Sequence, residues 1–204
     1  MVSDISRRMQ IPIFLNDDLL LLLKEGSPVL IPTDTLPALA ACPENASCLW
    51  KIKNRPMTKP FILMGSSSEK LLEFVMPEAL EDAFKIGSAY WPGALTIVVP
   101  AVKELVDNLN PFGSSIGMRV PACDFTINFL EKSGPLATTS ANISGHDPLL
   151  DPKAVSKCFP QLPLLGPLPW PKPSGQASTL IEWKAPGSWQ ILRIGAVIPL
   201  EVEQ

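Results

Sequence analysis

Residues 28–35 read PVLIPTDT, a short apolar run followed at once by hydroxyl and carboxyl side chains. An apolar run of this length between two prolines predicts a buried strand over residues 28–32. Ligands in open α/β sheets sit just beyond strand ends, so Thr33, Asp34 and Thr35 are candidate ligand contacts. The same residue types suit a helix cap or a turn, and the segment alone favours neither reading.

The chain around this segment alternates between helical and strand patterns. Helices are predicted over residues 16–25, 45–53, 78–88 and 124–132, with Gly26 and Gly134 as stops, Pro77 as a first residue, and Asn45 and Asp124 as caps. Strands are predicted over residues 61–64, 95–99, 116–120 and 135–139, with a closing pair over residues 178–183 and 189–194. This alternation predicts an α/β fold with a mixed twisted sheet, and 204 residues fit a single domain.

Residues 161–174 differ from the rest because they carry prolines at positions 163, 167, 169, 171 and 173. Proline has no backbone N–H to donate, so the segment predicts neither a strand ladder nor a helix. A loop over residues 160–174, extended on the surface, is the first interpretation. A flap over the ligand site is the alternative, because long loops in compact domains are often lids or binding loops.

Charge and hydropathy exclude several classes of protein. The formal net charge of −3 argues against a protein whose whole surface binds nucleic acid, although it leaves room for a local basic groove. The longest aliphatic run, residues 19–23, is far too short to span a bilayer, so no membrane association is expected. Arg7 and Arg8 are not followed by an apolar signal core, and a cytoplasmic location is therefore expected.

The four cysteines are not spaced as in a zinc ribbon, and a single histidine accompanies them. Buried free thiols are the first interpretation, with a disulfide or a metal role as the alternative. His146, the single histidine, has no partner motif and is interpreted as incidental. The sequence therefore predicts neither a metal site nor a catalytic triad.

Four cations lie within nine residues, at Lys51, Lys53, Arg55 and Lys59. A solvated helix face is the ordinary explanation for such a run. This run, however, passes from a helix end into a turn bounded by prolines, which favours an anion site in which Arg binds phosphate oxygens and Lys acts as a point charge. Arg119 lies within an apolar strand pattern, so it must line a cleft or take part in a buried ion pair.

Ser140 and Asn142 follow another predicted strand, in the segment Thr138-Thr139-Ser140-Ala141-Asn142-Ile143-Ser144-Gly145. An amide side chain offers both a donor and an acceptor, as the edge of a purine or a ribose requires. Together with the cationic cluster, this segment can hold a triphosphate and the polar atoms of a nucleotide. Neither segment matches a Walker-type loop or a Rossmann fingerprint.

The ordered set of these motifs resembles the YrdC/TsaC family of L-threonylcarbamoyladenylate synthases. The motifs that carry the resemblance are PTDT at 32–35, KNRPMTKP at 53–60, WPGALT at 91–96, MRVP at 118–121, TSANISG at 139–145 and ST at 178–179. Each motif alone is weak, whereas the set in family order is specific. The resemblance implies one YrdC-like domain over residues 1–204, with a core of about residues 15–200, a twisted mixed sheet, flanking helices and a large concave basic groove.

The resemblance also implies an activity. Family members combine L-threonine, bicarbonate and ATP into threonylcarbamoyl-AMP and release pyrophosphate, so a nucleotidyltransferase is expected. Mg²⁺ is expected to be carried with ATP rather than held by protein ligands. A downstream transferase then moves the threonylcarbamoyl group to tRNA, and RNA binding by the YrdC-like groove itself is a further expectation.

By the same resemblance, site residues can be assigned position by position. The implied catalytic set is Lys53, Arg55, Ser140 and Asn142. The implied ATP contacts are Arg55, Lys59, Ser115, Asn142 and Arg193. The implied threonine contacts are Thr35, Met64, Arg119, Ser140 and Ser178.

Two departures from the family pattern fall near the amino-acid end. Leu36-Pro37-Ala38 replaces a common Tyr-Gly step, and Met64 stands where many members place a histidine. The alternative function is therefore a diverged YrdC/YciO-type paralogue that binds nucleotide or RNA with a different amino-acid substrate or none. The intact Lys-x-Arg and Ser-x-Asn pairs favour the synthase.

Overall fold

The computed structural model describes residues 12–200, and within them ten strands form one sheet in the order β1-β8-β2-β3-β7-β4-β6-β5-β9-β10. The strands are β1 (Ile13–Phe14), β2 (Val29–Ile31), β3 (Ala38–Ala41), β4 (Ile62–Met64), β5 (Leu95–Pro100), β6 (Ser115–Arg119), β7 (Leu136–Ser140), β8 (Leu164–Leu165), β9 (Thr179–Ala185) and β10 (Ser188–Arg193). The helices are α1 (Asn16–Lys24), the 3₁₀ turn η1 (Pro43–Asn45), α2 (Ser47–Lys53), α3 (Ser68–Leu72), α4 (Pro77–Tyr90), α5 (Lys103–Leu109), α6 (Asp124–Ser133) and α7 (Pro152–Cys158).

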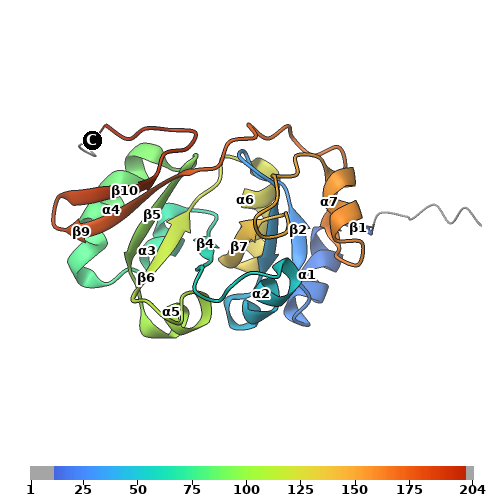
Figure 1. The fold of residues 1–204 in the computed structure, drawn as a ribbon, viewed down its shortest axis with the longest axis horizontal. Coiled ribbons are helices and arrows are strands. Elements are labelled where there is room, and N and C mark those ends of the chain that lie inside the picture. Colours follow the sequence, from blue (N-terminus) through green and yellow to red (C-terminus); the bar gives the residue numbers. More distant parts are fainter. Residues whose placement is uncertain (1–11, 201–204) are drawn as a thin grey trace, which may run out of the picture.

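The sheet is mixed and twisted, as the sequence predicts (Figure 1). Strand β4 runs parallel to β6, and β5 runs parallel to β9. Strand β7 lies antiparallel between β3 and β4, and β9 forms an antiparallel hairpin with β10. Strand β7 thus lies near the middle of the sheet. Its C-terminal end carries the hydroxyl side chains of the second polar motif.

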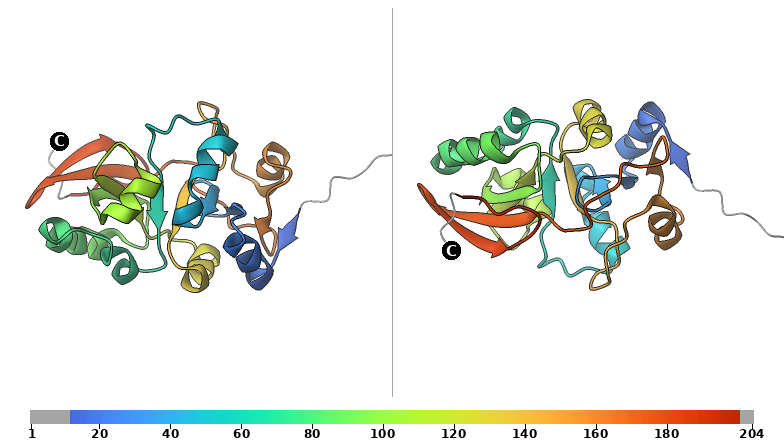
Figure 2. Two further views of the ribbon diagram at one scale, coloured as in Figure 1. Left: turned by 90° about the horizontal axis from the view of Figure 1, so that it is seen from below. Right: turned by 90° about the horizontal axis from the view of Figure 1, so that it is seen from above.

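Helices cover both faces of the sheet (Figure 2). Helices α1, α3, α4 and α6 lie along one face, and α2, α5 and α7 lie along the other. On the first face, Leu19 and Leu23 of α1 meet Phe129 and Leu130 of α6 in a fully buried cluster over β2 and β3. The apolar run at residues 29–31 is buried on both sides, which explains why it has no polar alternation.

Most predicted elements are present, but two of the predicted caps are wrong. The helix predicted from Asn45 is split into η1 and α2, because Pro43 begins a separate turn, and Ala46 occupies the cap position without a side-chain hydrogen bond. Asp124 is the first residue of α6, and Cys123 holds its cap position. Gly134 ends α6 with φ of 78°, as predicted.

The proline-rich segment is ordered more regularly than the sequence predicts. Leu164 and Leu165 form β8, which pairs in parallel with both β1 and β2, so the expectation that the segment has no strand ladder is wrong. The two leucines lie between prolines and are fully buried. Trp170 is also buried, and its indole N–H donates to the carbonyl of Leu165 at 2.6 Å.

Two further expectations concern the state of the cysteines and a membrane span. The four cysteines are free thiols, of which Cys123 is buried and the other three are half-buried. Burial raises the pKa of the Cys42, Cys48 and Cys123 thiols. Across residues 12–200, no helix is both long and apolar enough to cross a membrane.

Candidate active site

A pocket lies over the middle of the sheet and encloses about 640 Å³ of empty space, part of it open to solvent. Its floor comes from four neighbouring strands, with Ala38 of β3, the end of β7, Ile62 and Met64 of β4, and Arg119 of β6. The predicted site residues that line it are Thr35, Arg55, Met64, Arg119, Ser140, Ser178 and Arg193. The fold thus brings together residues from motifs that span most of the chain.

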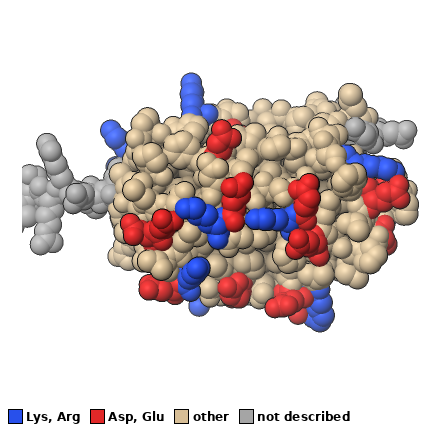
Figure 3. All heavy atoms as spheres, turned by 180° about the vertical axis from the view of Figure 1, so that it is seen from behind, with Lys and Arg blue, Asp and Glu red and all other residues tan. Residues whose placement is uncertain are grey.

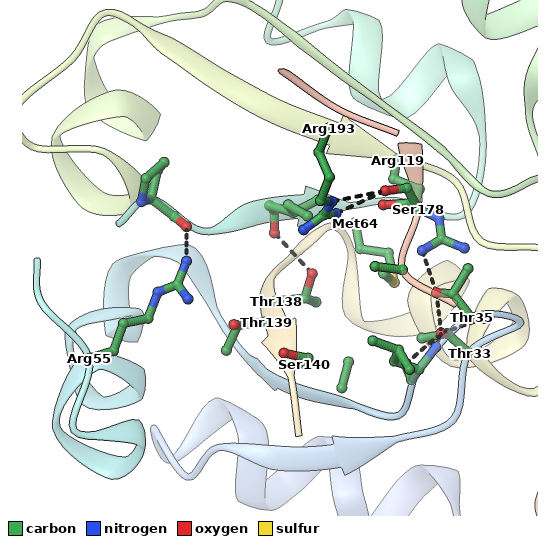
Figure 4. Close-up of a pocket in the computed structure, with 15 residues that line it drawn as sticks. Thr33, Thr35, Arg55, Met64, Arg119, Thr138, Thr139, Ser140, Ser178 and Arg193 are labelled. Atoms are coloured by element: carbon green, nitrogen blue, oxygen red, sulfur yellow. Dashed lines mark hydrogen bonds between the residues drawn. The ribbon is translucent and has the colours of Figure 1, made fainter. Parts of the chain in front are cut away.

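Three arginines give the pocket its charge (Figure 4). Arg55 enters from the α2–β4 loop at one end, and Arg119 and Arg193 lie at the other end with Ser178. Among the described residues that line the pocket, none is acidic. The pocket is therefore suited to an anionic ligand that is long enough to reach from Arg55 to Arg119.

Arg55 is held by the backbone that follows it. Its Nε donates to the carbonyl of Lys59 at 3.3 Å, and one terminal nitrogen donates to the carbonyl of Pro60 at 3.0 Å. The guanidinium also lies 5.8 Å from the ring centroid of Phe61. Burial lowers the pKa of this guanidinium, which nevertheless stays charged. The guanidinium of Arg55 therefore has a fixed orientation without a ligand, and its contact with an anion stays a prediction.

Arg119 lies in an apolar strand, and the sequence predicts that such an arginine lines a cleft or forms a buried ion pair. In the structure it does both. It is 4% exposed, and one terminal nitrogen lies 2.6 Å from the carboxylate of Asp34. The other terminal nitrogen donates to the hydroxyl of Thr35 at 2.7 Å, and Nε donates to the carbonyl of Gly93 at 2.8 Å. Burial lowers the pKa of this guanidinium, and the charge of Asp34 acts in the opposite direction.

The Thr33-Asp34-Thr35 segment is both a turn and part of the pocket. The hydroxyl of Thr33 accepts hydrogen bonds from the backbone N–H groups of Thr35 and Leu36, and it donates to the carbonyl of Leu36. Thr33, Thr35 and Leu36 nevertheless line the pocket. The turn reading is therefore confirmed, and contact of Thr33 and Thr35 with a ligand stays a prediction.

Arg193 and Ser178 lie together on the side of the pocket formed by the β9–β10 hairpin. Two nitrogens of Arg193 donate to the carbonyl of Ser178, at 2.9 Å and 3.3 Å. The hydroxyl of Ser178 pairs with that of Thr96 at 2.8 Å. Ser178 is therefore fixed through both its backbone and its side chain.

Lys53 is buried and does not line the pocket. It is 1% exposed, and its ammonium donates to the carbonyl of Ser140, to the hydroxyl of Ser140 at 3.3 Å and to the amide oxygen of Asn142 at 3.1 Å. The hydroxyl of Ser140 donates to the same amide oxygen at 2.7 Å. The predicted catalytic set thus contains a preformed network, in which Lys53 contacts Ser140 and Asn142 directly.

Three predicted contacts lie outside the pocket lining. Lys59 is exposed, and Ser115 begins β6, where its carbonyl accepts from Asn110 at 2.9 Å. Asn142 borders a neighbouring, largely apolar cavity together with His146 and Cys158. Their assignment as nucleotide contacts stays a prediction.

Sequence reasoning missed several residues that line the pocket. These are Pro60, Ile62 and Ala177, which are apolar, and Thr138 and Thr139, which the sequence placed in a motif without a role. Thr138 is buried and donates to the carbonyl of Ile62 at 3.1 Å. The sequence did hold a signal for Thr138 and Thr139, because they end a predicted strand directly before Ser140, which was already a candidate site residue.

The charge of Lys53 makes stability depend on pH in a defined direction. Burial, and then the positive charge of Arg55, lower the pKa of Lys53 from 10.5 to about 8. Between these two values the unfolded chain holds more protons than the folded chain, so stability rises with pH. We expect the difference in unfolding free energy between the wild type and Lys53→Met to grow in favour of the wild type from about pH 8 to about pH 10.

Denaturant unfolding of both proteins at several pH values measures this difference, and the Lys53→Met reference cancels the titration of other groups. A difference that stays constant from about pH 7 to about pH 10 would show that Lys53 keeps an ordinary pKa.

The chain matches the family model Sua5_yciO_yrdC, described as telomere recombination, over residues 21–195. It is 32% identical to the threonylcarbamoyl-AMP synthase of Rattus norvegicus over 189 residues, which cover 86% of this chain and 65% of that protein. It is 29% identical to the threonylcarbamoyl-AMP synthase of Homo sapiens, with the same two coverages. The chain therefore spans 65% of the length of these mammalian relatives.

Solved structures with the same fold include P. abyssi Sua5 complexed with L-threonine. Its TM-score is 0.79 at 25% identity, covering 91% of this chain and 57% of that chain. E. coli YciO has a TM-score of 0.79 at 20% identity, covering 94% of this chain and 99% of that chain. These similarities confirm the mixed α/β fold.

Proposed function

Because the chain belongs to the Sua5/YciO/YrdC family, we propose that it joins L-threonine, bicarbonate and ATP into threonylcarbamoyl-AMP and releases pyrophosphate. The relatives named threonylcarbamoyl-AMP synthase and the L-threonine complex of P. abyssi Sua5 support this proposal. The observation that carries it is the pocket in which Arg55, Arg119 and Arg193 face one cavity. ATP brings negative charge on its triphosphate, and L-threonine brings it on its carboxylate.

The chemistry requires positioning more than it requires a protein nucleophile. The amine of threonine attacks CO₂ derived from bicarbonate and loses a proton, which gives a carbamate. An oxygen of the carbamate then attacks the α-phosphorus, and the bond from this phosphorus to the bridging oxygen of pyrophosphate breaks. Fixed cations and N–H donors accelerate such a step by stabilising the charge that develops on the phosphoryl oxygens.

The roles proposed for individual residues follow their places in the pocket. Arg55 at one end would bind the phosphates, while Arg119 and Thr35 at the other end would bind the carboxylate and the amine of the amino acid. Lys53 would hold Ser140 at the pocket and Asn142 beside it. Met64 and Leu36 would form apolar walls beside the amino acid. Mg²⁺ would arrive with ATP as part of that substrate.

The proposal places a transferase that acts on tRNA downstream of this protein, since threonylcarbamoyl-AMP is a mixed anhydride and a reactive acyl donor. Direct RNA binding stays a prediction. The face seen in Figure 3 carries Lys and Arg side chains interspersed with Asp and Glu. RNA binding would therefore depend on another face, such as the one into which the pocket opens.

Pyrophosphate release by the purified protein, measured with ATP, Mg²⁺ and bicarbonate, tests the proposal. Release that depends on L-threonine, together with an adenylate product of the expected mass, is the expected result. No release with threonine, but release with another amino acid, would replace the proposal by a paralogue of different selectivity. No release with any amino acid would contradict the synthase.

A further inference from the structure

Asp34 does not line the pocket, yet its carboxylate forms an ion pair with Arg119, which does. Its Oδ1 lies 2.6 Å from a terminal nitrogen of Arg119, and the side chain is 17% exposed. The motif comparison gave this residue no role beyond its place between two threonines. Its position beside the amino-acid end suggests that it acts on the ligand through Arg119.

The hydrogen bonds of Arg119 define what it can offer a ligand. A guanidinium has five N–H donors. Nε uses its hydrogen on Gly93, one terminal nitrogen uses a hydrogen on Thr35, and the other uses a hydrogen on Asp34. One N–H on each terminal nitrogen therefore has no partner within the described residues. Two N–H groups of one guanidinium match the two oxygens of a carboxylate.

The hydroxyl of Thr35 can offer a ligand an acceptor, whereas Arg119 offers N–H donors. The proton of the Thr33 hydroxyl is used on the carbonyl of Leu36 at 2.7 Å. Two backbone N–H groups already occupy the lone pairs of the Thr33 hydroxyl, so its 3.1 Å contact with the Thr35 hydroxyl adds little. Thr35 accepts from Arg119, which leaves one lone pair on Thr35 for a ligand. Donors on Arg119 beside an acceptor on Thr35 match the carboxylate and the amine of an α-amino acid.

The backbone of Asp34 is fixed by the end of the proline-rich segment. The N–H of Ser174 donates to the carbonyl of Asp34 at 2.8 Å, and the N–H of Gly175 donates to the carbonyl of Thr35 at 3.0 Å. These bonds attach the end of the proline-rich segment to the turn. These two hydrogen bonds restrain the backbone that carries the Asp34 carboxylate.

We propose that Asp34 is a positioning residue for the amino-acid substrate, which it orients by holding the guanidinium of Arg119 against Thr35. The inference rests on the proposed function, because it requires an α-amino acid as ligand. Asp34 sets which N–H groups of Arg119 remain for the carboxylate. Its negative charge is secondary, since on charge alone it would repel the same carboxylate.

Two substitutions separate position from charge. Asp34→Asn keeps the side-chain length and one acceptor oxygen but loses the charge. Asp34→Glu keeps the charge but moves the carboxylate by one methylene. Because a displacement of about 1 Å in a positioned group can cost about 100-fold, we expect Asp34→Glu to weaken L-threonine binding by at least about tenfold. We expect Asp34→Asn to weaken it by about threefold, because a neutral acceptor holds Arg119 less firmly.

Titration calorimetry with L-threonine and, separately, with ATP measures both dissociation constants at a temperature where thermal scans show each variant folded. ATP binding should stay within about twofold of the wild type, because Asp34 is placed at the amino-acid end. Tighter threonine binding by Asp34→Asn, with unchanged binding by Asp34→Glu, would overturn the inference in favour of a charge effect.

Parallel weakening of both ligands would also overturn it, since that result indicates a structural role. If the wild type binds threonine and both variants bind it equally well, the inference fails alone. If the wild type binds ATP but no threonine, the proposed function fails and the inference fails with it.

Discussion

Arg55→Ala should lower threonine-dependent pyrophosphate release by at least about 100-fold, because it removes a preoriented donor from the end of the pocket where the phosphates are proposed to lie. The fold should survive. Arg55 contributes hydrogen bonds to two carbonyls, of Lys59 and Pro60, which water can reach and satisfy in its absence. We therefore expect a loss of less than about 1 kcal/mol in the free energy of unfolding.

The matched control is Lys51→Ala, which removes an exposed cation of the same cluster that does not line the pocket. Steady-state release of pyrophosphate, measured beside thermal unfolding, compares the two variants. Arg55→Lys should recover little, since a point charge does not reproduce bidentate contact with phosphate. Equal activity of Arg55→Ala and Lys51→Ala would mean that the phosphates bind elsewhere.

The cationic cluster shows how far the sequence could predict this site. The sequence predicts that positive charge gathers at a helix end, and it predicts that Arg55 is aimed by a proline-bounded turn. The family resemblance singles out Lys53, but the cationic run alone could not separate Lys51 from Lys53, because residues two apart lie about 200° around a helix and the inward face depends on packing. The structure exposes Lys51 and buries Lys53. Asn54, with φ of 49°, then ends the helix and turns the chain toward the pocket.

Strand β3 and strand β8 could not be predicted from local preference. The residues of β3 are Ala-Leu-Ala-Ala, which favour a helix when taken alone. They form a strand because β2 and β7 supply ladder partners on both sides and all four residues are buried. Leu164 and Leu165 form β8 for the same reason, since each proline beside them lies outside the paired residues. In both cases the tertiary context decides the local structure.

At the amino-acid end of the site, the sequence singles out the individual residues but does not predict which of them contact each other. The sequence indicates that Arg119 needs either a partner charge or a cleft, and it places Asp34 and Thr35 after a buried strand. It does not indicate that they meet, because β2 and β6 are separated in the sheet by β3, β7 and β4. Four strand spacings of about 4.8 Å are more than an arginine side chain can span, so the contact depends on the turn after β2, which carries Asp34 and Thr35 to Arg119 at the end of β6.

Arg119→Met should give the largest effect on stability of the variants proposed for the pocket. Removing one partner of a buried ion pair costs about 3–5 kcal/mol, because the remaining charge is left without compensation. Here the loss leaves the carboxylate of Asp34 unpaired and takes a donor away from Thr35 and from the carbonyl of Gly93. Methionine fills much of the vacated volume, so a cavity contributes little to the expected loss. Binding of L-threonine should be lost at the same time.

Arg193→Met is the matched control, since it removes an arginine from the same end of the pocket. Arg193 is exposed and donates to a single carbonyl, that of Ser178. Its loss should change the free energy of unfolding by less than about 1 kcal/mol. Denaturant unfolding of both variants measures this contrast, and equal stabilities would mean that the Asp34–Arg119 pair is as weak as an exposed one. A large contrast would show that one buried arginine joins β6, the β2 turn and the segment before β5. If Arg119→Met also loses L-threonine binding, the same side chain serves both stability and substrate recognition.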